Sequence, residues 1–192
     1  MRASWPPLYL TPVAEDALER SDGKWASAFA EAFGSIGKDG IAGRAGEPLV
    51  LRDWQKSLLD CLYARDESGG YVARTALIGM PRKNGKSALS SAGIAIYSLI
   101  AEGVQGAEVI VAAAEKEQAR IVFGEAKRMV ESSELADEVQ MFRDSIYVPS
   151  TKSVMRVVSA EAYSKEGLNP TFVLFDDMQI FRCIKSFCFS LR

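Results

Sequence analysis

The sequence predicts an α/β fold in which a parallel sheet is flanked by helices. Three observations predict it. Short apolar strands alternate with amphipathic helices over residues 71–175, a Gly-Lys-Ser tripeptide at 85–87 follows the first of these strands, and the last strand leads into Asp176 and Asp177. Consecutive strand–helix–strand units place their strands parallel in one sheet, and the helices then cover its faces.

The N-terminal part differs from this regular pattern. Residues 13–33 are predicted to form one helix that partly buries Leu18, Trp25, Phe29 and Phe33. Five glycines fall within residues 34–46, which is typical of a flexible connection.

The remaining elements follow from periodicity and from glycine and proline positions. In order, we expect a helix over 52–65, a buried strand over 71–79, a helix from 85–87 to Gly103, a strand over 108–113, a helix over 115–131, a hairpin of 145–148 and 153–159, and a strand over 171–175 that ends at the aspartates.

Composition excludes several classes of function. The chain of 192 residues has no histidine, so Ser-His and Cys-His catalysis and histidine-containing metal sites are excluded. Its three cysteines form neither a disulfide framework nor a zinc-type pair. A net charge of −2 gives no overall attraction to nucleic acid. Because there is no secretory signal and no apolar run long enough to span a bilayer, we expect a cytoplasmic protein without membrane contact.

The strand-to-helix junction at 81–87 carries the chemistry of a phosphate-binding loop. Gly85 lets the backbone approach an anion at a helix N-terminus, Lys86 can reach the β- and γ-phosphates of ATP, and the Ser87 hydroxyl can hold Mg²⁺. Met80 stands where the common pattern has its first glycine. The other candidate phosphate ligands in the loop are Arg82, Lys83 and Asn84. Gly-Lys-Ser also arises by chance at ordinary helix starts, and the flanking strand and helix favour the phosphate loop.

The aspartates after the last predicted strand suit the same chemistry. Such ATPases hold the Mg²⁺ shell with a carboxylate at a strand end and orient the attacking water with a neighbouring one. Asp176 is the candidate magnesium ligand, and Asp177 is the candidate catalytic base. The alternative is that the pair forms a turn or caps a helix.

Three segments resemble one family. The sequence at 81–87, with arginine early in the loop and no first glycine, is similar to the deviant phosphate loop of tailed-phage terminase large subunits. Residues 164–170 and 51–55 resemble that family's sequence before the aspartate strand and at the adenine site. The resemblance covers about residues 46–180. It implies a RecA-like or helicase-like ATPase core from a motor that packages viral DNA into the procapsid, in the host cytoplasm.

The resemblance also implies roles for individual residues. Trp54 and Gln55 would contact adenine, although Trp54 is equally suited to a place in the core. Arg82 and Lys86 would act on the phosphates during hydrolysis. Arg120 is a candidate for the arginine that stabilises the γ-phosphate charge, often in a neighbouring subunit, whereas most helix arginines are only solvated. Implied partners are other terminase subunits in a homo-oligomeric ring, the portal protein and double-stranded DNA.

The sequence departs from the family in two places. Asp176-Asp177 replaces the usual Asp-Glu, and residues 181–192 lose the family's pattern. We therefore divide the chain into a lead-in and flexible connection (1–46), an ATPase core (47–180) that is incomplete at its C-terminus, and a divergent tail (181–192), and we expect no nuclease domain. The alternatives are another P-loop ATPase, such as a helicase-like translocase, and an inactive remnant.

Overall fold

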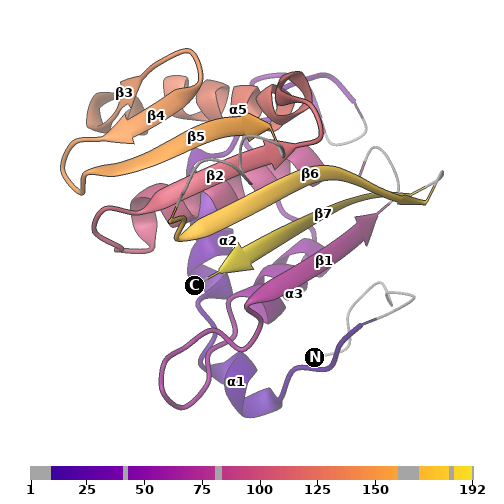
Figure 1. Cartoon of the computed structure of the whole chain (residues 1–192). Helices are drawn as coiled ribbons and strands as arrows, with labels where there is room; N and C mark the ends of the chain where they lie inside the picture. The colour runs from indigo at the N-terminus through magenta and orange to yellow at the C-terminus, as the bar shows by residue number, and fades with distance from the viewer. Residues whose placement is uncertain (1–9, 41–42, 81–83, 160–168, 182–183, 192) are drawn as a thin grey trace.

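The computed structural model describes residues 10–40, 43–80, 84–159, 169–181 and 184–191. Within these ranges the strands form one seven-stranded sheet in the order β1-β7-β6-β2-β5-β4-β3, which Figure 1 shows together with the helices. The strands are β1 (Thr75–Met80), β2 (Glu108–Ala113), β3 (Gln140–Met141), β4 (Ser145–Val148), β5 (Ser153–Ser159), β6 (Phe172–Phe181) and β7 (Ile184–Leu191). The helices are α1 (Glu15–Glu19), α2 (Gly23–Phe33), α3 (Asp53–Leu62), α4 (Lys86–Ala88), η1 (Leu89–Ala101), α5 (Lys116–Glu131) and η2 (Glu134–Glu138).

Five of the described strands, β1, β2, β3, β5 and β6, run in the same direction. β3 pairs antiparallel with β4, which pairs antiparallel with β5, so β3 runs with β5. β2 pairs parallel with both β5 and β6. β7 pairs antiparallel with both β6 and β1, so β1 also runs parallel to β6. The C-terminal ends of β1, β2, β5 and β6 therefore meet at one edge of the sheet, which we call the carboxyl edge. Ligands of open α/β sheets bind at this edge.

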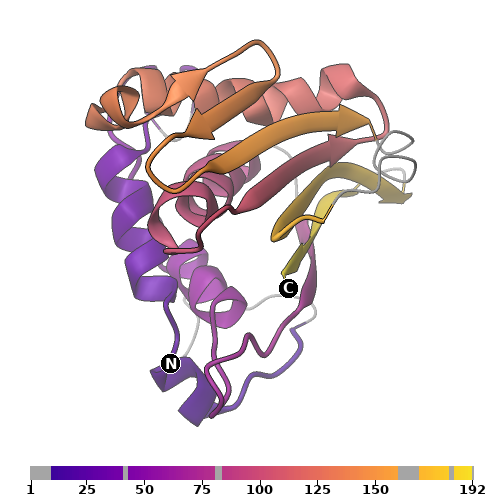
Figure 2. The ribbon, with the colours of Figure 1, turned by 60° about the vertical axis from the view of Figure 1, so that its left-hand side comes forward.

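η1 and α5 pack against one face of the sheet, which we call the helix face, and α2 packs on η1 and α3. Alternate residues of β2 point to opposite faces: Val109 and Val111 join the main core with the helices, whereas Ile110 and Ala112 belong to a smaller cluster on the other face. Figure 2 shows the described helices gathered on the one side. The structure confirms the predicted α/β class with a sheet flanked by helices.

The helix that follows the Gly-Lys-Ser tripeptide is buried over most of its length. It begins as α4 and continues as η1, in which the hydrogen bonds span five residues, as the bond from the N–H of Glu102 to the carbonyl of Tyr97 illustrates. Gly103 follows with a φ of 80°, so the predicted end of the helix is confirmed. The Ser91 hydroxyl donates to the carbonyl of Val122 at 2.9 Å and joins η1 to α5. None of the helices in the described ranges is long and apolar enough to cross a membrane.

The single helix predicted over residues 13–33 is wrong, because the chain breaks between α1 and α2. The Ser21 hydroxyl accepts the N–H of Gly23 and donates to the carbonyl of Asp60, which turns the chain at this point. Gly23 packs so closely on α3 that a Cβ there would lie 2.4 Å from the Cα of Asp60. The prediction that Trp25 is partly buried is also wrong, since 61% of the residue is exposed.

Two strand predictions need correction. β1 was expected to be a buried strand, but it lies at the edge of the sheet with a neighbour on one side in the described residues, and Leu77 is 57% exposed. β6 was expected to end at the aspartates, but it continues to Phe181 because β7 returns antiparallel beside it. The hairpin of β4 and β5 is confirmed, with Lys152 in its turn at a φ of 58°.

Candidate functional site

The predicted phosphate loop lies at the carboxyl edge, between the end of β1 and the start of α4. Gly85 occupies the position before α4 with φ 75° and ψ 22°, a left-handed conformation that glycine adopts without strain. The N–H of Leu89 bonds to the carbonyl of Gly85 at 3.0 Å, so the first helical turn begins at this glycine. Arg82 and Lys83 lie outside the described residues.

Asn84, Lys86 and Ser87 are all partly exposed at this edge. Lys86 and Ser87 open α4, and the Ser90 hydroxyl donates to the carbonyl of Lys86. A loop before a helix presents backbone N–H groups to an anion, and the helix dipole favours negative charge there. The structure thus places Gly85 directly before a helix start, and anion binding at this turn stays a prediction.

Gln55 lies directly against this turn. A Cβ at Gly85 would come within 3.3 Å of Nε2 of Gln55. The Oε1 atom of Gln55 accepts the backbone N–H of Arg52 at 2.9 Å, which caps the start of α3, and Gln55 is only 6% exposed. Trp54 packs on the main core and is partly buried. α3 thus brings Gln55 close to the start of α4. The contact of Trp54 and Gln55 with adenine stays a prediction.

Asp176 and Asp177 fall on an irregularity of β6. Phe175 pairs with Cys188 and Met178 pairs with Ser186, so two residues of β6 oppose the single residue Phe187 of β7. This is a β-bulge that contains both aspartates. Bulges change the direction in which side chains leave a strand and occur often beside active sites. In the parallel register with β2, Phe175 pairs with Ala112, so the bulge lies at the carboxyl edge.

Arg120 is engaged elsewhere in this structure. Its Nε and Nη2 atoms contact Oδ1 and Oδ2 of Asp144 at 2.8 and 2.9 Å, and its Nη1 pairs with Glu117. Lys116 also contacts Oδ2 of Asp144 at 2.9 Å. Hydrogen bonds from Arg120, and to a smaller extent from Lys116, hold the pKa of Asp144 well below its ordinary value of 3.8. The role of Arg120 at a γ-phosphate stays a prediction.

Asp144 is the residue of this cluster that the sequence did not single out. It lies 24 residues from Arg120 in the chain, and no local pattern joins the two positions. Among the side chains that the structure describes, no group of three acidic, cysteine or histidine residues could hold a metal ion. The predicted magnesium ligands Ser87 and Asp176 would have to share the ion with nucleotide phosphates, as is usual for Mg²⁺.

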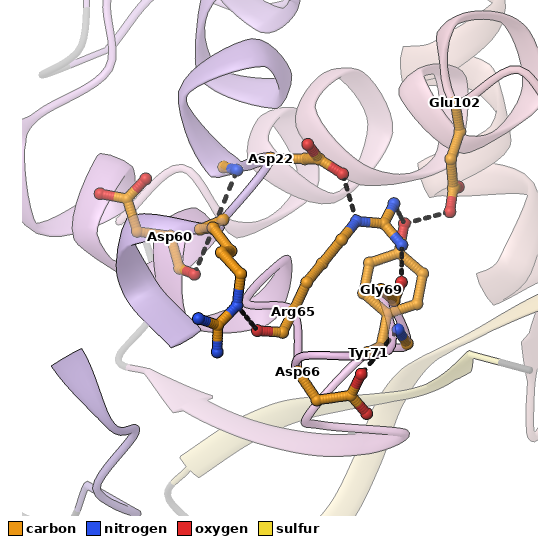
Figure 3. Close-up of polar contacts among 11 residues, drawn as sticks. Asp22, Asp60, Arg65, Asp66, Gly69, Tyr71 and Glu102 are labelled. Carbon is orange, nitrogen blue, oxygen red and sulfur yellow. Dashed lines mark hydrogen bonds and ion pairs between the residues drawn. The ribbon is translucent and has the colours of Figure 1, made fainter. Parts of the chain in front are cut away.

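A second polar cluster lies away from the carboxyl edge, in the segment that leads into β1 (Figure 3). Nε of Arg65 contacts Oδ2 of Asp22 at 2.5 Å, its Nη1 donates to the carbonyl of Gly69 at 2.8 Å, and its Nη2 donates to the Tyr71 hydroxyl at 2.9 Å. That hydroxyl donates in turn to Glu102, and burial raises the pKa of Tyr71. A cavity of about 390 Å³ adjoins the cluster. Through these bonds the cluster joins Asp22, in the α1–α2 turn, to Glu102 at the end of η1.

Comparison with known proteins identifies the family of the chain. The model of the terminase large subunit ATPase domain matches residues 53–185. The chain is 30% identical over 141 residues to the terminase large subunit of Enterobacteria phage HK97, which covers 69% of this chain and 26% of that protein. The crystal structure of the HK97 bacteriophage large terminase matches with a TM-score of 0.67 and 26% identity, over 84% of this chain and 32% of the other. The chain therefore belongs to the family of the terminase large subunit ATPase domain.

Proposed function

We propose that the chain binds ATP with Mg²⁺ at the carboxyl edge and that Gly85, Lys86 and Ser87 hold the phosphates. The observation that carries the proposal is the left-handed Gly85 at the start of α4, at the edge where the β6 bulge carries two aspartates. An ATPase-domain family uses nucleotides, and the matched range includes all of these residues.

Each residue has a separate task in this proposal. Backbone N–H groups at Gly85 and at the start of α4 bind phosphate oxygens, and Lys86 neutralises charge on the β- and γ-phosphates. Ser87 and Asp176 complete the Mg²⁺ shell. Arg82, Lys83 and Asn84 add contacts to the phosphates. Adenine lies near Trp54 and Gln55.

Hydrolysis requires two further groups. Asp177 orients and deprotonates the attacking water. Arg120 supplies positive charge to the γ-phosphate of a neighbouring copy. α5, which carries Arg120, packs on α4, and in this structure the guanidinium is held by Asp144, just before β4. Action on a neighbouring subunit is the arrangement that the family resemblance implies.

The parent function that we infer is packaging of double-stranded viral DNA, with ATP hydrolysis as its energy source. The chain spans 26% of the length of its HK97 relative, so the complete motor contains much more than this domain. Portal protein, other terminase subunits and DNA are the proposed partners of that motor. Membership of the terminase family favours packaging over an unrelated helicase-like translocase.

Titration of the whole chain with ATP, with and without Mg²⁺, tests the site. We expect Ser87→Ala and Asp176→Asn to remove most of the gain in affinity that Mg²⁺ gives, because each loses one ligand of the ion. The matched control is Ser132→Ala, just beyond α5. An unchanged Mg²⁺ effect in both variants would contradict the proposed metal ligands.

A further inference from the structure

The start of α3 is held in place by both of the helices that pack on it. The Glu31 carboxylate of α2 accepts the N–H of Leu51 at 2.9 Å and contacts Nζ of Lys56 at 3.0 Å. One turn further along α3, Leu59 packs on η1 so closely that a Cβ at Gly93 would lie 3.3 Å from its Cδ1 atom. The first turn of α3 is therefore anchored to α2 and to η1.

Gln55 joins this anchored turn to Gly85. Its backbone N–H donates to the carbonyl of Arg52 at 2.8 Å, and its Oε1 atom accepts the N–H of Arg52 at 2.9 Å. Because only the oxygen of the amide can accept an N–H, the atom that faces Gly85 is the nitrogen, Nε2, 3.3 Å from the place of a Cβ there. Gln55 is 6% exposed, so its amide is packed against the turn rather than surrounded by solvent.

The conformation of the Gly85 turn matters for phosphate binding. An anion at a helix start is bound by backbone N–H groups, which have to point at it together. Gly85 has a φ of 75°, and glycine moves between conformations more freely than other residues. A buried side chain packed against the turn limits this freedom. It lowers the entropy that the turn loses when a ligand binds.

We propose that Gln55 is a positioning residue of the phosphate site, which holds the Gly85 turn ready for a triphosphate whatever base it carries. The inference rests on the proposed function and adds a role on the phosphate side to the expected place of Gln55 near adenine. A residue that contacts only the base would leave the binding of inorganic tripolyphosphate unaffected. A residue that only caps α3 could be replaced by glutamate without loss, since a carboxylate in this position caps a helix equally well and suits its dipole.

The test is titration of the full chain with ATP and with inorganic tripolyphosphate, each with Mg²⁺. The variants are Gln55→Glu, Gln55→Met and the control Gln140→Glu, which makes the same change of charge at an exposed position on β3, at the opposite edge of the sheet. Gln55→Glu keeps the acceptor for Arg52 but loses the donor that faces Gly85, and Gln55→Met loses that donor without adding charge.

We expect Gln55→Glu to unfold at about the wild-type temperature, because the cap of α3 is kept. Both Gln55 variants should bind tripolyphosphate about tenfold more weakly than wild type, and ATP more weakly by at least that factor. Gln140→Glu should bind both ligands as wild type does.

The outcomes separate this inference from the proposed function. Wild-type affinity of Gln55→Met for tripolyphosphate overturns the positioning role, whether its affinity for ATP is unchanged or is lowered, as for a base contact. A wild-type chain that binds neither ligand overturns the proposed function and this inference with it. If Gln55→Glu does not fold, Gln55→Met decides the matter at a temperature at which it is folded, since its loss of tripolyphosphate affinity supports the role and an unchanged affinity contradicts it.

Discussion

The side-chain amide of Gln55 lies against Gly85, so that a Cβ at Gly85 would meet Nε2 of Gln55 at 3.3 Å. The same amide caps α3 through its oxygen, which accepts the N–H of Arg52. One buried side chain therefore fixes the position of α3 relative to the turn that begins α4. Changes at Gly85 should affect both the backbone of the turn and this contact.

Gly85→Ala should weaken Mg·ATP binding by at least about tenfold, because a Cβ blocks close approach of the backbone to phosphate. It should also lower the free energy of unfolding by about 1–2 kcal/mol, the usual cost of a left-handed alanine. Gly106→Ala is the matched control, since Gly106 has a φ of 67° and open space around it. Chemical denaturation should show a similar loss of stability in both variants. Equal ATP affinity in the two would contradict the placement of the site.

Gly23→Ala and Gly124→Ala should change stability in opposite directions, although both glycines lie in helices. A Cβ at Gly23 would lie 2.4 Å from backbone atoms of Asp60, and we expect a loss of about 1–3 kcal/mol. At Gly124 the nearest atom is Nη1 of Arg128 at 3.9 Å, and alanine should add about 0.5–1 kcal/mol through helix propensity. Urea unfolding measures both, and a stable Gly23→Ala protein would show that α2 does not pack on α3 in this way.

Asp144→Asn should destabilise the protein at neutral pH, and the difference from wild type should shrink on acidification. The folded state lowers the pKa of Asp144 below 3.8, so its stabilising effect is complete above that value and is lost as pH falls through the lower, folded pKa. Thermal unfolding from pH 7 down to pH 2 measures the difference. Asp137→Asn, an exposed acid in η2, serves as the control. A difference that stays constant over this range would show that Arg120 and Lys116 do not hold Asp144.

Leu77→Lys should slow aggregation without loss of stability. β1 is an edge strand, its sequence from Thr75 to Met80 has no charge, and Leu77 is 57% exposed, which makes it a template for pairing between chains. A lysine on an edge strand opposes such pairing. The control is Ile121→Lys, which removes an equally exposed apolar residue from α5. Light scattering during mild heating should show slower aggregation only in Leu77→Lys, and equal rates in both would contradict the edge argument.

Much of the fold follows from the sequence because its signals are local. β2, β4 and β5 have the predicted limits, and α5 begins one residue after its predicted start. In these segments the apolar pattern and the bounding turns agree. The predictions are wrong where contacts between residues far apart in the sequence determine the structure. The break before Gly23 depends on Asp60, and the exposure of β1 depends on its place in the strand order.

Some features of the candidate site were likewise predictable from the sequence, and others were not. The left-handed glycine before a helix and the aspartates at the carboxyl edge follow from residue type and position in the chain. The bulge at Asp176 and Asp177 was not predictable, because it depends on pairing with β7, a strand formed by residues without a recognisable pattern. The pairing of Arg120 with Asp144 likewise joins positions that no local period connects.

The most direct test of the ATP site is isothermal titration of ATP with Mg²⁺ into the wild-type chain, Lys86→Ala and Lys152→Ala. All three proteins should unfold at similar temperatures, because Lys152 is exposed and Lys86 is partly exposed. We expect wild type and Lys152→Ala to bind ATP with equal affinity and Lys86→Ala to show no measurable binding. Equal affinity of Lys86→Ala and wild type would contradict this expectation.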